Sequence, residues 1–502
     1  MSLPQRIVWF MDVRTVLLCL VLLLILRWFF GRPKNLPPGP WGFPIVGSIL
    51  AIVLEIRRGV QPHNLFMKYA AKYGPVFHLK ILNKTVVVLN DYASTKEAFQ
   101  YPQLNDRPHM LFTELFKSEG VAMASGEPWI ELRRFCLTVL RSFGVGKTSF
   151  EEKIGEEAEA LMKEMSSFNG KPFNPKPLLS NATSNVICSV IFGKRYDYNN
   201  EEFKKLLSLF SENVRLFGAG GVFLFFPALR HLPFVSSNQL ELNGQQVRKF
   251  ITTVIDNHRA AFDSDNLNDF IDVFLKEIKS NEEKAKAGVK HGHLTEHSFV
   301  GTVANLFAAG TETTATTLQW ALLYMAVYPK IQKQVQAEID DVVGRNRLPR
   351  MADKSQLNFT QAVIWEVQRL TIVAPLGVAH AAASDTQLRG FTIPKGALLV
   401  PNLWAVSHDS NVWPEPDQFK PERFLNDQGE AAKVDELIPF SVGRRSCIGE
   451  HLAKMELVIF FSYLMHQFTF KKPDNSLPLS LKGRGGFTNS PVEYDICVCK
   501  RD

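Results

Sequence analysis

The sequence has little cysteine and no internal repeat, and both absences limit what the protein can be. Six cysteines in 502 residues, scattered along the chain, are too few for a disulfide framework and favour a reducing compartment. Without a repeat or a low-complexity tract, one folded domain is the simplest organisation. The net charge of +7 is modest, so it favours acidic partners or anionic lipid without requiring nucleic acid.

Apolar and aromatic residues, by contrast, are plentiful. Their share of 46%, with 38 phenylalanines, predicts a sizeable and aromatic-rich core. Residues 76–82 and 85–89 read as a β-hairpin with its turn at Asn83 and Lys84, and residues 397–400 read as a further strand. Most later segments have helical periodicity. We therefore predict a mainly α fold with small β-sheets.

The N-terminal region carries an apolar run over residues 15–26. A helix over residues 7–30 would span roughly 36 Å, enough to cross a bilayer if its charged side chains reach the interface. A cleaved signal peptide is the alternative, but no small-residue cleavage site follows the run. An uncleaved anchor is therefore predicted. Arg27, Arg32 and Lys34 outnumber Arg6 and Arg14, which predicts that the bulk of the chain lies in the cytoplasm.

A proline-rich segment, residues 37–44, follows the predicted anchor. Such a segment is stiff and extended, and it suits a connection between an anchor and a folded body. The predicted organisation is therefore an N-terminal transmembrane anchor at residues 1–31, a hinge at 32–48 and a catalytic domain at 49–502.

One loop, residues 440–449, has the chemistry of a metal-thiolate site. Its spacing is Phe-x-x-Gly-x-Arg-x-Cys-x-Gly, with Cys447 as the candidate iron ligand. Gly443 and Gly449 can adopt backbone angles that other residues resist, and Arg445 can pair with a carboxylate on a cofactor's rim. A helix is predicted directly after the loop, so the thiolate would lie near a helix N-terminus. The alternative is a buried structural cysteine.

A second motif lies within a long predicted helix over residues 299–328, which ends before Pro329. At its middle, Ala308–Thr314 combines a glycine with three threonines, whose hydroxyls can bond preceding carbonyls and open space for a small ligand. Glu312 followed by Thr313 is a plausible proton relay for oxygen activation. The alternative is a capping cluster between two shorter helices.

Both motifs resemble those of the cytochrome P-450 superfamily, namely its haem-binding loop and its oxygen-activation helix. The segments 309–314, 320–325 and 440–445 look like the animal microsomal family-two enzymes, most nearly the J-type branch. The resemblance implies the P-450 fold, haem b bound through Cys447, and a monooxygenase of the endoplasmic reticulum membrane. It further implies O2 as co-substrate and electrons from NADPH through a flavoprotein reductase, with cytochrome b5 as a second candidate partner.

Other polar residues gain a role from the resemblance. Trp129 and Arg133, one helical turn apart, can both bond a haem propionate, although a solvated helix face is the alternative. Arg107 and His380 are implied as further propionate contacts, with Ala379 standing where close relatives often carry proline.

A structural ion network and a docking patch are expected as well. Glu366, Arg369 and Arg423 match the superfamily's Glu-x-x-Arg motif and its second arginine, which support the haem side of the fold. Four cations flank the haem-binding motifs and are candidates for docking an acidic electron donor, with solubilising surface charge as the alternative: Arg134, Arg141, Lys147 and Arg444.

The implied substrate pocket is almost entirely apolar. Its residues are Phe112, Ala122, Met123, Phe217, Phe223, Ala309, Ala374, Val378 and Phe487. Such a lining predicts lipophilic substrates that are hydroxylated or epoxidised, and the J-type branch favours long-chain polyunsaturated fatty acids as well as xenobiotics.

Two other functions compete with this prediction. A haem-thiolate isomerase or dehydratase would rearrange peroxides without external electrons and would not need the Glu312–Thr313 relay. A haem sensor would signal through a partner, but the chain carries no signalling module. Separately, three histidines, His291, His293 and His297, could bind zinc, although their Gly and Lys neighbours favour an exposed loop.

Overall fold

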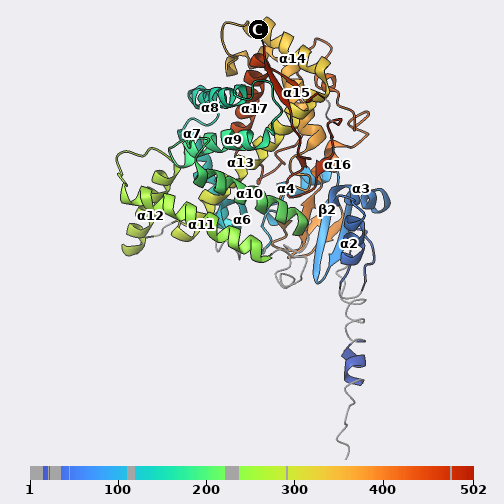
Figure 1. Cartoon of the computed structure of the whole chain (residues 1–502). Coiled ribbons are helices and arrows are strands. Elements are labelled where there is room, and N and C mark those ends of the chain that lie inside the picture. Colours follow the sequence, from blue (N-terminus) through green and yellow to red (C-terminus); the bar gives the residue numbers. More distant parts are fainter. Residues whose placement is uncertain are drawn as a thin grey trace, which may run out of the picture. The chain divides into compact units, whose positions relative to one another are not determined.

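Helices with small accompanying sheets make up the computed structural model of the chain (Figure 1). The structure describes residues 15–20, 22, 35–43, 46–109, 119–220, 237–289, 292–474 and 477–501. The chain forms two compact units. The smaller unit comprises Met1–Asn105 and Ala379–Asn402, and the larger unit comprises Asp106–Val378 and Leu403–Asp502.

A four-stranded sheet with the order β1-β2-β6-β3 organises the smaller unit. β1 (Val76–Ile81) and β2 (Lys84–Leu89) are antiparallel, and β2 runs parallel to β6 (Leu398–Pro401), which pairs with β3 (His380–Ala381). The predicted hairpin and third strand are thus present. The turn falls at Leu82 and Asn83, one residue earlier than expected, because Lys84 already pairs with Ile81.

Short helices and a second hairpin complete this unit. They are α2 (Ile49–Arg57), α3 (Pro62–Tyr73), α4 (Tyr92–Gln100), η1 (Pro102–Leu104), β4 (Thr386–Leu388) and β5 (Phe391–Ile393). Asp91 caps α4, because its side chain accepts a 2.5 Å hydrogen bond from the backbone N–H of Ser94.

The proline-rich segment lies along β1. The backbone N–H of His78 donates to the Pro38 carbonyl at 2.8 Å, and the His78 ring lies 2.6 Å from the Pro37 carbonyl. These contacts fix Pro37 and Pro38 against β1, whereas Gly42 has a φ of +60°, so the described part of the segment is not extended throughout.

Most of the predicted anchor lies outside the described residues. Residues 15–20 and 22 are helical, and their side chains are exposed. In the part of the chain that the structure describes, no helix has the length and apolar character needed to cross a membrane.

Fourteen helical segments in the described residues and two small sheets build the larger unit. The helical segments are α6 (Gly120–Met123), α7 (Gly126–Ser142), α8 (Thr148–Ser166), α9 (Lys176–Ile191), α10 (Glu201–Gly220), α11 (Ser237–Ala260), α12 (Phe270–Lys286), α13 (Glu296–Val327), α14 (Pro329–Val343), η4 (Met351–Gln356), α15 (Asn358–Thr371), α16 (Leu403–Ser407), η5 (Pro421–Phe424) and α17 (Glu450–Gln467). β7 (Phe468–Lys471) pairs with β10 (Cys497–Lys500), and β8 (Gly483–Arg484) pairs with β9 (Ser490–Pro491).

The long helix α13 is the axis of the larger unit. Thr295 and Ser298 form a capping box at its start, and Tyr328 ends it directly before Pro329, which opens α14. In Figure 1, α14, α15 and α17 lie above α13, whereas α10, α11 and α12 lie below it. The predicted long helix is confirmed and begins three residues earlier, at Glu296.

Small and hydroxyl-bearing residues bring α9 close to α13. A Cβ at Gly310 would lie 3.0 Å from a side-chain carbon of Ile187, so a larger residue would separate the two helices. Thr183 donates to the Thr311 carbonyl at 3.0 Å, and Ser184 donates to the Thr311 hydroxyl at 3.1 Å. The central Thr-rich stretch is therefore a packing surface on this side.

A buried carboxyl joins α13 to α17. Glu456 is 1% exposed, and one of its oxygens accepts a 3.0 Å hydrogen bond from the Thr314 hydroxyl. Its other oxygen has no hydrogen-bond partner among the described residues. Burial raises the pKa of Glu456 to about 8, against which the Thr314 hydrogen bond has a smaller lowering effect. Glu456 is therefore a neutral carboxylic acid at neutral pH.

This assignment predicts a pH-dependent effect of Glu456→Gln. Between the ordinary pKa of a glutamate and about 8, the folded parent holds a proton that the unfolded chain releases, so the parent loses stability as pH rises through this window. The substituted glutamine stays neutral at every pH and avoids that loss. The free energy of unfolding of the variant relative to the parent should therefore grow from pH 5 to pH 8, by up to about 1.4 kcal/mol per pH unit. Denaturant unfolding at several pH values measures it, and a constant difference would contradict the assignment.

Candidate functional site

The loop of residues 440–449 has a tight, glycine-dependent backbone. Gly443 has a φ of +80°, the left-handed region that favours glycine, and its carbonyl accepts from the Ser446 N–H at 3.1 Å. The Cys447 N–H donates to the Phe440 carbonyl at 3.0 Å. Gly449 has a φ of −87°, so the expectation of an unusual backbone angle there is wrong. A Cβ at Gly449 would lie 4.0 Å from the Cys447 sulfur, an ordinary contact distance, so the described protein atoms around this position leave room for a side chain.

Cys447 lies just before α17, as predicted, with Gly449 as the N-cap residue. Its side chain is exposed. Nearby protein atoms nevertheless desolvate the thiol and raise its pKa, and the negative charge of Glu450 adds to this. A hydrogen bond from the Gly449 backbone and the charge of Arg133 lower the pKa. A bound cation is the natural means of keeping such a sulfur deprotonated.

Helix α7 contributes an indole and a guanidinium to the surroundings of this loop. Trp129 is 6% exposed, and the guanidinium of Arg445 lies 4.0 Å from its ring centre. One turn later, Arg133 donates to the Ser446 hydroxyl at 3.3 Å. The solvated-face alternative therefore does not hold for Trp129. Within the described residues, the Trp129 indole N–H and the remaining Arg133 nitrogens donate to no acceptor.

Two further arginines are fixed by backbone carbonyls. Arg107 donates to the carbonyls of Ala122 at 3.0 Å and Val378 at 2.8 Å. Arg445 donates to the Ala124 carbonyl at 2.7 Å. These bonds tie the Cys447 loop, the start of α7 and the segment after α15 into one cluster of cationic side chains.

The electrostatics of the cluster favour an anionic ligand. Burial lowers the pKa of Arg107 well below its ordinary value, and the charges of Arg445 and Arg133 lower it further. Burial lowers the pKa of Arg445 to about 9, with Asp106 raising it and Arg133 lowering it. Guanidiniums that repel one another at a buried position need a counter-charge. A haem, with carboxylates on its rim and an iron for the thiolate, fits this donor set.

His380 belongs to the smaller unit. Its ring stacks on Phe99 at 3.8 Å between ring centres, and Nδ1 lies 3.0 Å from the Leu104 carbonyl. Its contact with a propionate stays a prediction.

The helix α13 is uninterrupted at Glu312 and Thr313, so the alternative of two shorter helices is wrong. The Thr313 hydroxyl donates to the Ala309 carbonyl at 2.8 Å, as the sequence pattern predicts for a helical threonine. Glu312 is buried, which raises its pKa, whereas the charge of Lys176 lowers it. Consecutive helical residues point about 100° apart. Glu312 and Thr313 thus face different directions from the helix.

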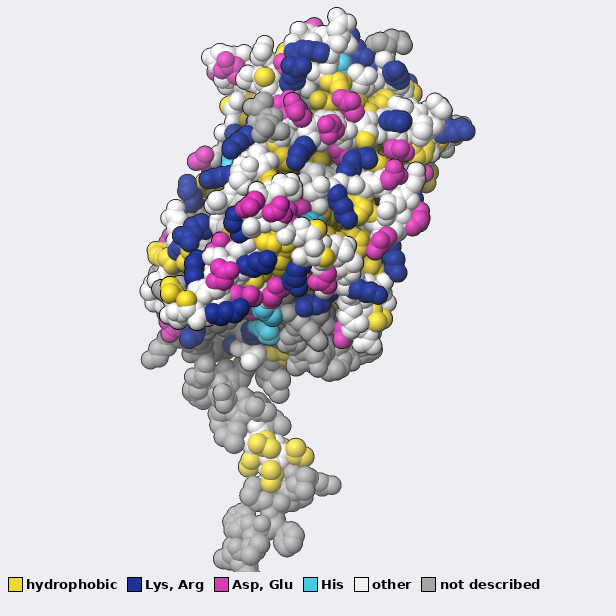
Figure 2. All heavy atoms as spheres, turned by 90° about the vertical axis from the view of Figure 1, so that its left-hand side faces the viewer, with side chains coloured by type: hydrophobic (Ala, Val, Ile, Leu, Met, Phe, Trp, Pro, Cys, Tyr) yellow, Lys and Arg dark blue, Asp and Glu magenta, His cyan; other side chains and the backbone are white. Residues whose placement is uncertain are grey.

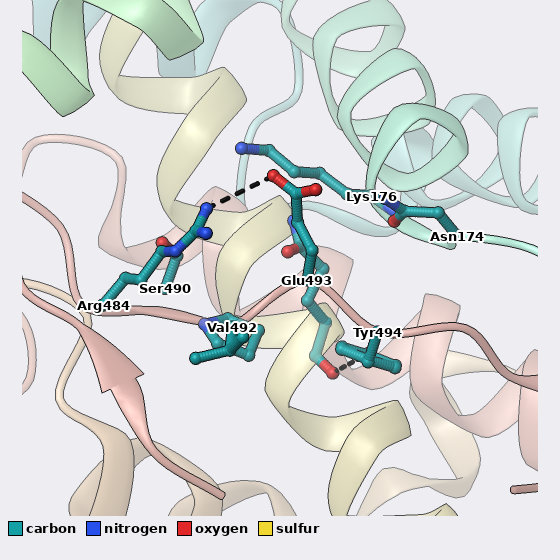
Figure 3. Close-up of a pocket in the computed structure, with 9 residues that line it drawn as sticks. Asn174, Lys176, Arg484, Ser490, Val492, Glu493 and Tyr494 are labelled. Carbon is teal, nitrogen blue, oxygen red and sulfur yellow. Dashed lines mark hydrogen bonds and ion pairs between the residues drawn. The ribbon is translucent and has the colours of Figure 1, made fainter. Parts of the chain in front are cut away.

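Lys176 was not anticipated from the sequence. It begins α9 and lines a small polar pocket together with Gln319 and a C-terminal segment (Figure 3). There Arg484 pairs with Glu493 at 3.3 Å, and the Tyr494 hydroxyl donates to the Gln319 carbonyl at 2.5 Å. Lys176 lies 136 positions before Glu312, so no local pattern connects the two residues.

Some of the predicted pocket residues lie within the described part of the chain and others do not. Phe112 and Phe223 lie outside the described residues, and the side chain of Phe217 is not described. Ala122 and Met123 are on α6, which meets α13 where the Ala122 N–H donates to the Asn305 side chain at 3.0 Å.

Ala309 is exposed on α13, one turn after Asn305 and therefore on the same side of the helix. Ala374 and Val378 are half-buried after α15. Phe487 is 45% exposed, and its neighbour Asn489 donates to the Val373 carbonyl at 2.9 Å. These contacts bring Phe487 and Ala374 into one region.

The three members of the expected ion network are in contact. Glu366 and Arg369 are both fully buried and form a two-pronged pair at 2.7 and 2.9 Å. Arg423 adds a 3.0 Å bond to the same carboxylate. Arg369 also donates to the carbonyls of Ser407 and Pro416, which fixes the segment between α15 and η5.

The four candidate docking cations are all exposed. Arg134 and Arg141 lie two turns apart on one face of α7, and Lys147 precedes α8. The neighbouring Gly146 approaches the His451 side chain, on the first turn of α17. The loop before α8 is therefore close to the loop that carries Arg444 and Cys447.

Comparison with known proteins agrees with this geometry. The family model described as Cytochrome P450 matches residues 37–498. Cytochrome P450 2J3 of Rattus norvegicus is 41% identical over 499 residues, which cover 98% of this chain and 97% of the relative. Cytochrome P450 2J2 of Homo sapiens is 40% identical over 492 residues, which cover 97% and 96%.

A U-type relative is almost as similar. Cytochrome P450 2U1 of Rattus norvegicus is 39% identical over 508 residues, with 97% of this chain and 95% of the relative covered. The predicted likeness to the animal family-two enzymes and their J-type branch is thereby confirmed. With a near full-length family match around Cys447, the chain belongs to the cytochrome P450 family and is a haem-dependent monooxygenase.

Proposed function

We propose that the protein is a microsomal monooxygenase that hydroxylates or epoxidises lipophilic substrates, with long-chain polyunsaturated fatty acids and xenobiotics as its substrate classes. Cys447 would hold the haem iron through its thiolate, and electrons would come from NADPH through a flavoprotein reductase. The observation that carries the proposal is the convergence of Arg107, Trp129, Arg133 and Arg445 on the Cys447 loop.

Haem, when bound, supplies the redox-active iron that activates O2. The chain's own residues then have distinct tasks. Arg107, Arg133 and Arg445 would hold the haem carboxylates, with Trp129 as a further donor and His380 as a fifth candidate. Cys447 supplies the negative sulfur, and the rigid Gly443 turn keeps it at a fixed position.

Thr313 and Glu312 deliver protons from α13. Thr313 holds its hydroxyl at the Ala309 carbonyl, on the helix side that carries the proposed pocket residue Ala309. Glu312 is a buried carboxyl with a raised pKa, which suits a group that exchanges protons near neutral pH. Because the two side chains diverge, a water molecule or a rotamer change must connect them.

The pocket composition supports the substrate class. Ala122, Met123, Ala309, Ala374 and Val378 offer no charged side chain to a ligand, so a long apolar chain is bound by surface burial. The J-type similarity of the whole chain supports fatty acids within that class. Phe112, Phe217, Phe223 and Phe487 complete the proposed lining.

The membrane assignment rests on the sequence. Residues 1–31 are the proposed anchor in the endoplasmic reticulum membrane, 32–48 the hinge, and 49–502 the catalytic domain on the cytoplasmic side. Cytochrome b5 is a second electron donor in this proposal.

Turnover by the membrane-expressed protein with purified reductase tests the activity. With arachidonic acid, oxygenated products should form only when NADPH is present. Thr313→Val, which removes the hydroxyl, should lower product formed per NADPH consumed several-fold, and Thr313→Ser should keep most of it. Products are counted by mass spectrometry and NADPH by absorbance.

The isomerase alternative makes the opposite prediction. It would convert a fatty-acid hydroperoxide without NADPH, and Thr313→Val would leave that rate unchanged. This outcome would overturn the monooxygenase proposal for fatty acids.

The docking proposal predicts a charge-specific loss of electron transfer. Arg134→Glu combined with Arg141→Glu reverses two exposed cations on one face of α7 and should raise the reductase concentration needed for half-maximal turnover by about tenfold at low salt. The difference should shrink at high salt, because screening weakens the attraction in the parent. Lys205→Glu combined with Lys249→Glu, which reverses two exposed cations of α10 and α11, changes the net charge equally and should behave like the parent. Equal effects of the two double changes would show that net charge alone matters.

A further inference from the structure

A cluster of metal-ligating side chains lies between α11 and α12, apart from every residue assigned above. His258 stands near the end of α11, Asp269 is the N-cap residue of α12, and Asp272 is in the first turn of α12. One ligand atom from each lies within 4.8 Å of the other two. The two helices lie side by side at the lower left of Figure 1. Figure 2 views the molecule from this side, where acidic and basic side chains intermingle.

The orientation of His258 suits a metal ligand. Its Nδ1 lies 2.7 Å from the Val254 carbonyl, which can only accept, so Nδ1 carries a hydrogen. The other nitrogen, Nε2, faces Asp269 Oδ2 at 2.8 Å. Metal-bound histidines typically donate their second N–H to a backbone carbonyl in this way. In the metal-free cluster a proton occupies the space between Nε2 and the carboxylate.

Asp272 has an oxygen that the fold does not use. Its side chain is 9% exposed, and Oδ2 accepts from the Asn268 backbone N–H at 3.0 Å. No hydrogen bond reaches Oδ1 from the residues that the structure describes. Because Oδ1 is not shut off from solvent, water or a cation can reach it, and no protein donor competes for this position.

The cluster opens on a hollow of about 230 Å³. All three side chains line it, together with Asp263 and Asn266, which supply further oxygen atoms. Gly193 lines the opposite side with a φ of +62°, and a Cβ there would lie 2.7 Å from Asp269 Oδ2. The glycine therefore leaves this carboxylate oxygen accessible.

Helix capping and an ion pair explain only part of the arrangement. Asp269 Oδ1 accepts from the Asp272 N–H at 3.1 Å, which is an ordinary N-cap bond. A cationic His258 near a helix C-terminus is also favourable. Neither accounts for Oδ1 of Asp272 or for the hollow in front of it.

We propose that His258, Asp269 and Asp272 form a binding site for a divalent transition metal, with zinc as the ion that fits best. One imidazole nitrogen and two carboxylate oxygens leave a fourth position open toward the hollow, which is the ligand number of open zinc sites. Zinc displaces the proton between His258 and Asp269, which goes to solvent. The bound ion joins the end of α11 to the start of α12.

The zinc content of the haem-loaded full chain tests the site. Protein in detergent is stripped with a chelator, incubated with micromolar zinc, dialysed and analysed for zinc per haem by atomic emission. The parent should retain one zinc per chain. His258→Gln and Asp272→Asn should each weaken retention at least tenfold. His451→Gln, which removes an exposed imidazole that belongs to neither candidate zinc site, is the matched control and should retain zinc like the parent.

X-ray absorption at the zinc edge decides the ligands without any variant. Nitrogen and oxygen neighbours with one imidazole signature are expected. Sulfur neighbours would place the ion at Cys497 and Cys499 on β10 and overturn the proposal. So would a parent that retains no zinc, or variants that retain it fully, because the cluster would then be a helix cap and an ion pair only.

Discussion

The gathering of three guanidiniums beside one thiol is the constraint on which the site depends. Burial lowers the pKa of Arg107, Arg133 and Arg445, and the charge of Arg133 lowers the pKa of the other two further, so their arrangement is unfavourable in isolation. It persists because backbone carbonyls of Ala122, Ala124 and Val378 fix two of them. The fold thus holds in place a set of donors that only a multiply charged anion can satisfy. A cofactor that carries carboxylates and a metal supplies the negative charge for the three arginines and the cation for the Cys447 sulfur.

The helix α13 is held in place by contacts with several neighbouring helices. The threonines at its centre have different partners. Thr311 accepts a hydrogen bond from α9, Thr314 donates to Glu456 of α17, and Thr313 donates to a carbonyl of its own helix. Gly310 lets α9 approach closely. Substitutions at Gly310, Thr311 or Thr314 therefore disturb contacts between helices, whereas Thr313, the proposed proton donor, bonds only its own helix.

Local patterns in the sequence predicted much of the fold and the site. The hairpin, the long helix before Pro329 and the helix after Cys447 follow from periodicity and from proline and glycine positions, which act over a few residues. The roles of Trp129 and Arg107 came from resemblance. What the sequence could not supply depends on how separate helices pack: the effect of the Lys176 charge on Glu312, the bond of Thr314 to Glu456, and the approach of His258 to Asp269. The turn at Leu82 and the ordinary φ of Gly449 were misjudged because neighbours, not residue type, set them.

The most direct test of the account is the carbon monoxide difference spectrum of the reduced, membrane-expressed protein. The parent should show the strongly red-shifted Soret band of a thiolate-ligated haem, and Cys447→Ser should lose it. Cys497→Ser, which changes a cysteine of β10, should keep the band. A Cys447→Ser protein with an unchanged haem content and the same red-shifted band would show that another group ligates the iron, and the assignment of this loop would be wrong.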